Sequence, residues 1–308
     1  MSTSPIVRKV RMFNLQRRPL GDKNIETVLC PRCLEGYDRK HLEKNPSTAR
    51  TCCEIYWTIE DAPTVQEGRR LQLSGTYRRA LTCSTCNSGA GETFENTHGL
   101  LINKIIPETK LRIDETVKNL ARNGPSTCSD CGKGKPVRID ITDVYEGLDA
   151  SRIMELKEAY ILAFAALGYS YILCPELDEV RRWIAPGTTE LPVSTCSAIS
   201  LDFLPPNHLA VLAGDIHGIA VALPAHHVGA HAHVVFLPRP GGPAATDFYR
   251  SIENQQQFQI HPIEVHPWPE SGKPPFHWDN CDDVHPTTQH RYGTALGEIQ
   301  LRPLSDEG

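Results

Sequence analysis

The pattern of apolar positions between residues 152 and 167 is the clearest in the chain. Apolar side chains recur there at helical spacing, at Ile153, Leu156, Tyr160 and Phe164. Gly168 follows, and glycine often ends helices because it tolerates positive φ. The segment therefore predicts an amphipathic helix over 152–167.

Beyond residue 186 the apolar residues fall into short runs between prolines and glycines. The runs cover 193–204, 209–213, 216–223 and 232–237. Runs of this length and spacing are typical of strands joined by turns, so we expect a meander of antiparallel strands. Roughly the last 70 residues are rich in proline and histidine with few apolar runs, which predicts that much of this tail is loop or partly ordered.

The first half of the chain has shorter and less regular patterns. β-Branched and aromatic residues predict a strand at 54–59, in a run that Pro63 ends. Short strands are also expected at 70–73 and 79–81, and these two can pair as a hairpin. The other predicted elements are a helix at 90–104, a strand at 111–113, and helices at 115–122 and 178–183.

Two CxxC pairs, Cys30/Cys33 and Cys83/Cys86, carry the strongest chemical signal. Such pairs are typical of structural zinc sites, in which four thiolates form a closed tetrahedral shell. The residues after Cys86 suit a helix start, because Asn and Ser side chains accept from the first backbone N–H groups. A knuckle, a hairpin and a second knuckle that opens a helix together predict a treble-clef zinc unit. The alternative is a set of buried thiols that bind no metal.

Several motifs resemble a bacterial HNH-endonuclease-like family. They are Cys30-Pro-Arg-Cys33, Thr58-Ile-Glu60-Asp61-Ala-Pro63 and Leu81-Thr-Cys83-Ser-Thr-Cys86-Asn87, followed by Gly91 and Glu95. The likeness covers residues 28–105, and a weaker one extends over 157–184. The resemblance implies a ββα-metal core braced by zinc, which hydrolyses nucleic-acid phosphodiesters with a divalent metal.

The resemblance also implies a catalytic site. In this site Glu60 and Glu95 are oxygen ligands of the metal, and Asp61 holds the position of the base. Asn87 is the orienting residue at the start of the helix. Hard oxygen ligands of this kind suit Mg²⁺ or Mn²⁺. The family has a histidine where this chain has Asp61, and an aspartate with an ordinary pKa of about 3.9 is the weaker base near neutral pH. His98, three residues after Glu95 on the same helix face, either supplies the missing imidazole or merely packs.

Two further clusters leave alternatives open. Cys128 and Cys131 form a third CxxC pair, which either joins Cys52 and Cys53 in a second zinc site or lies as free thiols in a turn. Histidines gather at 226, 227, 231 and 233, and the last two project to one face of a strand, as metal-binding pairs do. The flanking alanines and glycines suggest instead a loop that leads into a core strand.

Composition narrows the class of protein. The chain has 308 residues, of which 40% are hydrophobic and 22% charged, as in soluble globular proteins. The longest apolar run, 159–173, is too short to span a bilayer. No apolar run follows the basic residues near the N-terminus, which predicts no signal peptide and a cytoplasmic location. Residues 1–150 carry a net charge of +4 and residues 151–308 one of −9, which suits a nucleic-acid partner at the N-terminal half or, equally, a solvated charged face.

These patterns predict an α+β protein of two domains. Residues 1–145 form the zinc-braced treble-clef domain, and residues 146–308 form a domain of helices and antiparallel strands with a Pro/His-rich tail. The expected function is an HNH-type endonuclease with structural Zn²⁺ and catalytic Mg²⁺ or Mn²⁺, with DNA as the favoured substrate and RNA as the less favoured one. The alternative is a non-catalytic zinc module that binds nucleic acid or a protein, with the acidic C-terminal domain as a surface for a protein partner.

Overall fold

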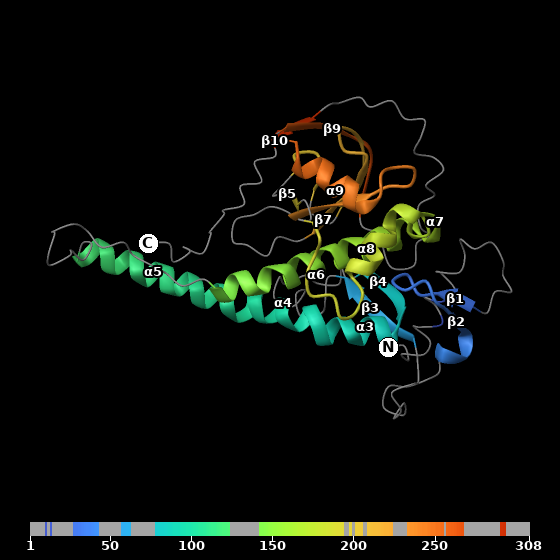
Figure 1. The fold of residues 1–308 in the computed structure, drawn as a ribbon, viewed down its shortest axis with the longest axis horizontal. Helices are drawn as coiled ribbons and strands as arrows, with labels where there is room; N and C mark the ends of the chain where they lie inside the picture. Colours follow the sequence, from blue (N-terminus) through green and yellow to red (C-terminus); the bar gives the residue numbers. More distant parts are fainter. Residues whose placement is uncertain are drawn as a thin grey trace.

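The computed structural model combines helices with antiparallel strands (Figure 1). This confirms the predicted mixture of the two, while the treble-clef assignment stays a prediction. The structure describes residues 10, 13, 27–42, 57–62, 78–123, 142–193, 197–198, 201–205, 208–223, 233–255, 257–267 and 290–293. Among these residues, no helix combines the length and the hydropathy that a membrane span requires.

The elements follow one another in a mixed order along the chain. The strands are β1 (Thr27–Leu29), β2 (Gly36–Asp38), β3 (Trp57–Ala62), β4 (Arg78–Cys83), β5 (Ser197–Ala198), β6 (His208–Gly214), β7 (Gly218–Leu223), β8 (His233–Pro238), β9 (Gln257–Pro267) and β10 (His290–Gly293). The α-helices are α3 (Ser84–Ala90), α4 (Asn96–Leu100), α5 (Ile106–Asn123), α6 (Thr142–Leu167), α7 (Tyr169–Ile172), α8 (Asp178–Trp183) and α9 (Ala245–Glu253). Short 3₁₀ helices lie at Arg39–Leu42 and Pro175–Leu177.

One helical run extends without a break from Ser84 to Asn123. The π-helical segments Gly91–Glu95 and Leu101–Ile105 join α3, α4 and α5, and the backbone at these junctions keeps right-handed helical angles. The last part, α5, projects from the rest of the molecule as an arm (Figure 1). The strand predicted at 111–113 is therefore wrong. Two alternating apolar residues are too few to identify a strand. The segment continues the helix instead, in which its backbone N–H and C=O groups bond to one another.

Helix α6 runs through the middle of the molecule. It contacts α4 and β4 on one side and β7 and β8 on the other. The run from Ile153 to Leu167 is buried almost throughout, including the charged residues Lys157 and Glu158. The helix ends at Gly168, which has φ 72° and donates its N–H to the carbonyl of Phe164 at 2.8 Å. The predicted helix is confirmed, but it is covered on both faces because it lies between two layers.

A six-stranded sheet forms one of these layers. Its order is β10-β9-β6-β7-β8-β5, and all its pairings are antiparallel. Strands β6, β7 and β8 confirm the predicted meander over 209–237. Of the run 193–204, only β5 forms a strand among the described residues, and it pairs with β8. Within the tail that was expected to be largely loop or partly ordered, α9, β9 and β10 are regular elements. Pro262 of β9 suggests a break, yet it faces Leu212 where the register with β6 shifts, and proline is tolerated at such irregularities.

Two smaller sheets belong to the cysteine-bearing part of the chain. Strands β1 and β2 flank the first CxxC pair, and β3 pairs with β4 from Trp57↔Cys83 to Ala62↔Arg78. The sequence predicted residues 70–73 as the partner of 79–81, and 70–73 lie outside the described residues. Helix α3 begins directly after β4 and contacts both β3 and β4.

One large buried cluster joins helices and sheets, and a smaller one includes Phe94 and Ile153. The large cluster includes Cys30 and Leu81 from the first half and Leu162, Val221 and Phe236 from the second. The division into domains at residue 145 stays a prediction, since one core contains residues from both sides of it.

Candidate metal centre

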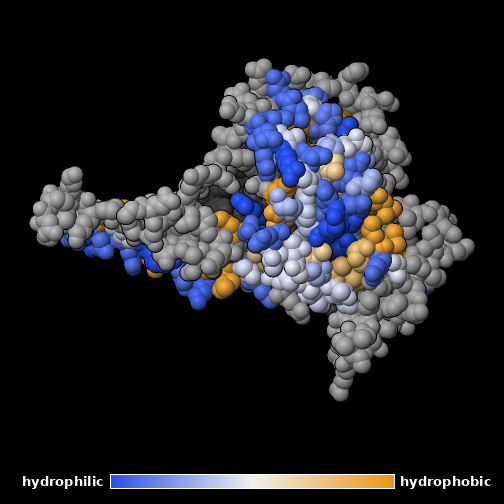
Figure 2. Space-filling model, viewed as in Figure 1, coloured by the Kyte–Doolittle hydropathy of each residue, from blue (hydrophilic) through white to orange (hydrophobic). Residues whose placement is uncertain are grey.

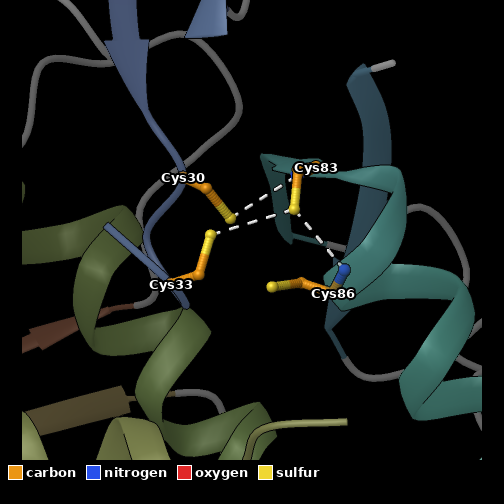
Figure 3. Close-up of side chains that lie close together, drawn as sticks. All are labelled: Cys30, Cys33, Cys83 and Cys86. Atoms are coloured by element: carbon orange, nitrogen blue, oxygen red, sulfur yellow. Dashed lines mark hydrogen bonds between the residues drawn. The ribbon is translucent and has the colours of Figure 1, made fainter. Parts of the chain in front are cut away.

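Four cysteines converge where β1, β4 and α3 meet, and we call them the cysteine cluster. Cys30 follows β1, Cys33 lies in the next turn, Cys83 ends β4, and Cys86 lies in the first turn of α3 (Figure 3). Their sulfur atoms all lie within 4.8 Å of one another. In a tetrahedral zinc–thiolate site, bonds of about 2.3 Å put the sulfurs about 3.8 Å apart. The Sγ atoms of Cys33 and Cys83 are 3.9 Å apart, so the cluster could hold a metal such as zinc.

Backbone hydrogen bonds help to hold these sulfurs in place. The N–H of Cys83 donates to Sγ of Cys30, and the N–H of Cys86 donates to Sγ of Cys83, both at 3.4 Å. The first knuckle closes through the N–H of Leu34 on the carbonyl of Cys30 at 2.8 Å. Leu34 has φ 58°, a left-handed conformation that costs a residue other than glycine about 1–2 kcal/mol. Surrounding packing must therefore impose this turn.

Electrostatics at the cluster favour a divalent cation. Hydrogen bonding from Cys30 lowers the pKa of the Cys33 thiol to about 7. Bonds from Cys30 and Cys33 hold the pKa of Cys83 far below its ordinary value. The pKa of Cys30 is raised mainly by its hydrogen bond with Cys33, and that of Cys86 mainly by its bond with Cys30. Four thiolates this close together would repel one another, so a cation is needed to stabilise them together, as structural zinc does.

Side chains from distant helices fix the first knuckle. The hydroxyl of Tyr160 on α6 donates to the carbonyl of Pro31 at 2.5 Å, and that of Tyr169 on α7 donates to the carbonyl of Leu29 at 2.6 Å. Arg32 is also buried, and it donates to the carbonyls of Cys86 and Ile184. The roles of these three side chains were not predicted. The position of Arg32 between two ligand cysteines was the only available signal.

The predicted catalytic residues lie on elements that adjoin the cluster. Glu60 and Asp61 belong to β3, where they face Ala80 and Arg79 of β4 in the register. The placement of their side chains lies outside what the structure describes. Asn87 is half-buried in α3, which contacts β3.

The other two predicted catalytic residues face α6 instead. The carboxylate of Glu95 accepts a hydrogen bond from Nζ of Lys157, whose side chain is 2% exposed. The ring of His98 is 2% exposed, and its Nδ1 lies 3.0 Å from Oγ of Ser151. Both side chains are thus engaged at the interface with α6. Nothing in the local sequence identifies Lys157 as their neighbour, because it lies 62 residues beyond Glu95.

Several predicted ligands lie outside the described residues. These are Cys52, Cys53, Cys128, Cys131, His226, His227 and His231. His233 begins β8, but its side chain is not among those described. A second zinc site and a histidine site both stay predictions.

Comparison of the chain with protein-family models, with curated proteins and with solved structures gives no match. The cysteine cluster therefore rests on its own geometry, and the likeness to HNH endonucleases rests on the short motifs alone.

Proposed function

We propose that the protein is an HNH-type, metal-dependent endonuclease whose fold is held by a structural zinc ion at the cysteine cluster. The observation that carries this proposal is the order of elements at the cluster: a strand pair, then a CxxC turn that opens a helix. Together with the motif likeness, this order supports a treble-clef unit with a ββα arrangement of β3, β4 and α3. DNA is the preferred substrate, with RNA as the less favoured one.

The zinc ion would have a structural role only. Four thiolates complete a tetrahedral shell and leave no open position for water or substrate. Hydrolysis therefore has to come from other residues nearby.

Residues for a second, hard cation remain on β3 and α3. Glu60, Asp61 and Asn87 offer oxygen atoms of the kind that Mg²⁺ and Mn²⁺ prefer. When bound, such an ion supplies Lewis-acid stabilisation of the leaving oxygen. Asp61 holds the base position and would orient or deprotonate the attacking water. Glu95 is not part of this set, because Lys157 engages its carboxylate.

A non-catalytic zinc module that binds nucleic acid or a protein is the second candidate. The ion pair between Glu95 and Lys157 and the buried contact of His98 with Ser151 favour it. Each interaction engages a side chain that the resemblance assigns to catalysis. In this case the acidic second half would offer the surface for a protein partner.

Metal analysis tests the structural zinc. We expect one zinc ion per purified chain, and none retained after Cys83→Ser. Two ions per chain would support a further site at the third CxxC pair. A wild-type chain that takes up no zinc would contradict the proposed centre.

Plasmid nicking separates the two candidate functions. The full chain is incubated with supercoiled DNA and Mg²⁺ or Mn²⁺, as wild type, Glu60→Ala and Asp61→Ala. Glu108→Ala, on the exposed face of α5, is the matched control. Nicking that is lost in the β3 variants and kept in the control supports the endonuclease. A shift in DNA mobility without nicking in any variant supports the binding module.

A further inference from the structure

Arg32 is the charged residue closest in sequence to the cluster, and it is almost completely buried. It lies between Cys30 and Cys33, and its side chain is 3% exposed. Arginine stays ionised in proteins, and burying it is costly unless nearby groups compensate the charge. Its partners should therefore explain why the chain places a cation here.

The guanidinium joins three separate parts of the molecule. Its Nη1 donates to the carbonyl of Cys86 at 2.6 Å, and its Nη2 donates to the carbonyl of Ile184. Cys86 belongs to the second knuckle, and Ile184 is the C-cap of α8. Arg32 thus connects the first knuckle, the second knuckle and α8. These acceptors lie 54 and 152 residues away in sequence.

The charges at this position are complementary when the cluster holds its ion. Four thiolates around Zn²⁺ carry a formal charge of −2 in a buried position, which the interior disfavours. The guanidinium of Arg32, which donates to the carbonyl of the ligand residue Cys86, offsets part of this charge. The carbonyl at the C-terminal end of α8 adds a further partial negative charge for Arg32.

We propose that Arg32 is a positioning residue of the zinc centre, which balances its charge and couples metal binding to the docking of α8 on the two knuckles. The inference rests on the structural zinc proposed above. Since linkage is reciprocal, zinc must tighten the α8 contact by as much as that contact tightens zinc.

Tyr169 provides a matched control. Its hydroxyl reaches the same knuckle, at the carbonyl of Leu29, but through a neutral hydrogen bond. Tyr169→Phe should lower stability by the cost of one such bond, about 1 kcal/mol. It should change the affinity for zinc much less than Arg32→Gln does, because it removes no charge.

The test measures zinc affinity by competition with a chromophoric chelator, using the full chain. Arg32→Gln keeps a hydrogen-bond donor but removes the charge. Arg32→Lys keeps the charge but removes the planar guanidinium with its two donating nitrogens. We expect Arg32→Gln to lower zinc affinity at least tenfold, Arg32→Lys to lower it less, and Tyr169→Phe to stay within twofold of wild type. Cobalt substitution gives a second readout: the thiolate absorption should keep its tetrahedral form in all variants that load.

The coupling is read from thermal unfolding with and without chelator. The gain in melting temperature that zinc gives should be smaller in Arg32→Gln than in wild type. Equal zinc affinity in the Gln and Lys variants would overturn the charge argument. An equal loss of zinc affinity in Arg32→Gln and Tyr169→Phe would mean that Arg32 contributes only through its packing and hydrogen bonds. A wild-type chain without zinc would instead refute the zinc centre, so the two failures are distinguishable.

Discussion

The cysteine cluster and the arm α5 are built on opposite principles. At the cluster, hydrogen bonds join residues far apart in sequence, such as Tyr160 with Pro31 and Arg32 with Cys86. Along the arm, the side-chain bonds are local, as from Thr116 to the carbonyl of Arg112 at 2.7 Å. The cysteine cluster forms only when the whole chain is folded, whereas the arm is an extension of one helix.

The cysteine cluster and the arm also differ in how much of their side chains is exposed. In the arm, Leu111 is 58% and Val117 57% exposed, and Figure 2 shows hydrophilic and hydrophobic residues interspersed along its visible surface. Most of the stabilisation of a helix in a protein comes from packing one face against other elements. Substitutions at the cluster should therefore affect the whole molecule, while those on the arm should stay local.

The largest effect is expected from Cys83→Ser. Structural zinc sites contribute an apparent 10–16 kcal/mol in small zinc peptides, roughly as much as the total stability of a typical domain. Loss of one of four ligands should release the metal and lower the melting temperature by more than about 10 °C. Metal analysis and thermal unfolding followed by circular dichroism measure both quantities.

Cys174→Ser is the matched control for this substitution. Cys174 is buried too, and burial raises the pKa of its thiol to about 12. It is not part of the cluster, so zinc content should stay at the wild-type value, with a stability loss of about 1–3 kcal/mol from burying a hydroxyl. Equal losses of zinc in the two variants would contradict the assignment of the cluster.

The cysteine spacing predicted which four residues meet, because each CxxC turn presents two thiols at a fixed spacing. The partner of β4 could not be obtained in this way. The pairing depends on which segment of the chain folds back against β4, and the sequence predicted strands at both 54–59 and 70–73. Arg32 and Lys157 were missed for another reason. Charged residues are rarely buried, so nothing but the tertiary structure reveals their partners.

Lys157→Met should have the second-largest effect. It leaves the carboxylate of Glu95 without the ammonium that donates to it. Removing one member of a buried pair costs about 3–5 kcal/mol, and the lower end applies because the side chain of Glu95 is 21% exposed. Urea unfolding of the zinc-loaded chain measures this loss.

The double variant Lys157→Met with Glu95→Gln tests the origin of that loss. Because the second substitution removes the uncompensated charge, we expect it to restore more than half of the stability. If the double variant were as unstable as the single one, packing of the lysine stem would be the cause, and the ion pair would have little importance.

A smaller effect, visible only as a pH dependence, is expected at Glu179. Its carboxylate accepts from the N–H of Thr246 at the start of α9 at 2.7 Å, and this bond lowers its pKa in the folded protein. A lowered pKa stabilises the fold above the unfolded value of about 4.3, and this stability is lost as pH falls through the folded value. Melting temperatures between pH 3 and 7 should show wild type above Glu179→Gln at neutral pH, with the difference closing in acid. Glu190→Gln, which replaces an exposed carboxylate, is the matched control for the loss of one negative charge.

The smallest effect is expected on the arm, from Leu111→Ala. The leucine is mostly exposed, so little apolar burial is lost, and alanine has the higher helix propensity. The two contributions oppose each other, and we expect a change within about 0.5 kcal/mol in stability and none in zinc content. A loss above about 2 kcal/mol would be as large as that of a buried leucine. Such a result would mean that Leu111 is covered in solution, and the arm would then share the tertiary dependence of the cluster.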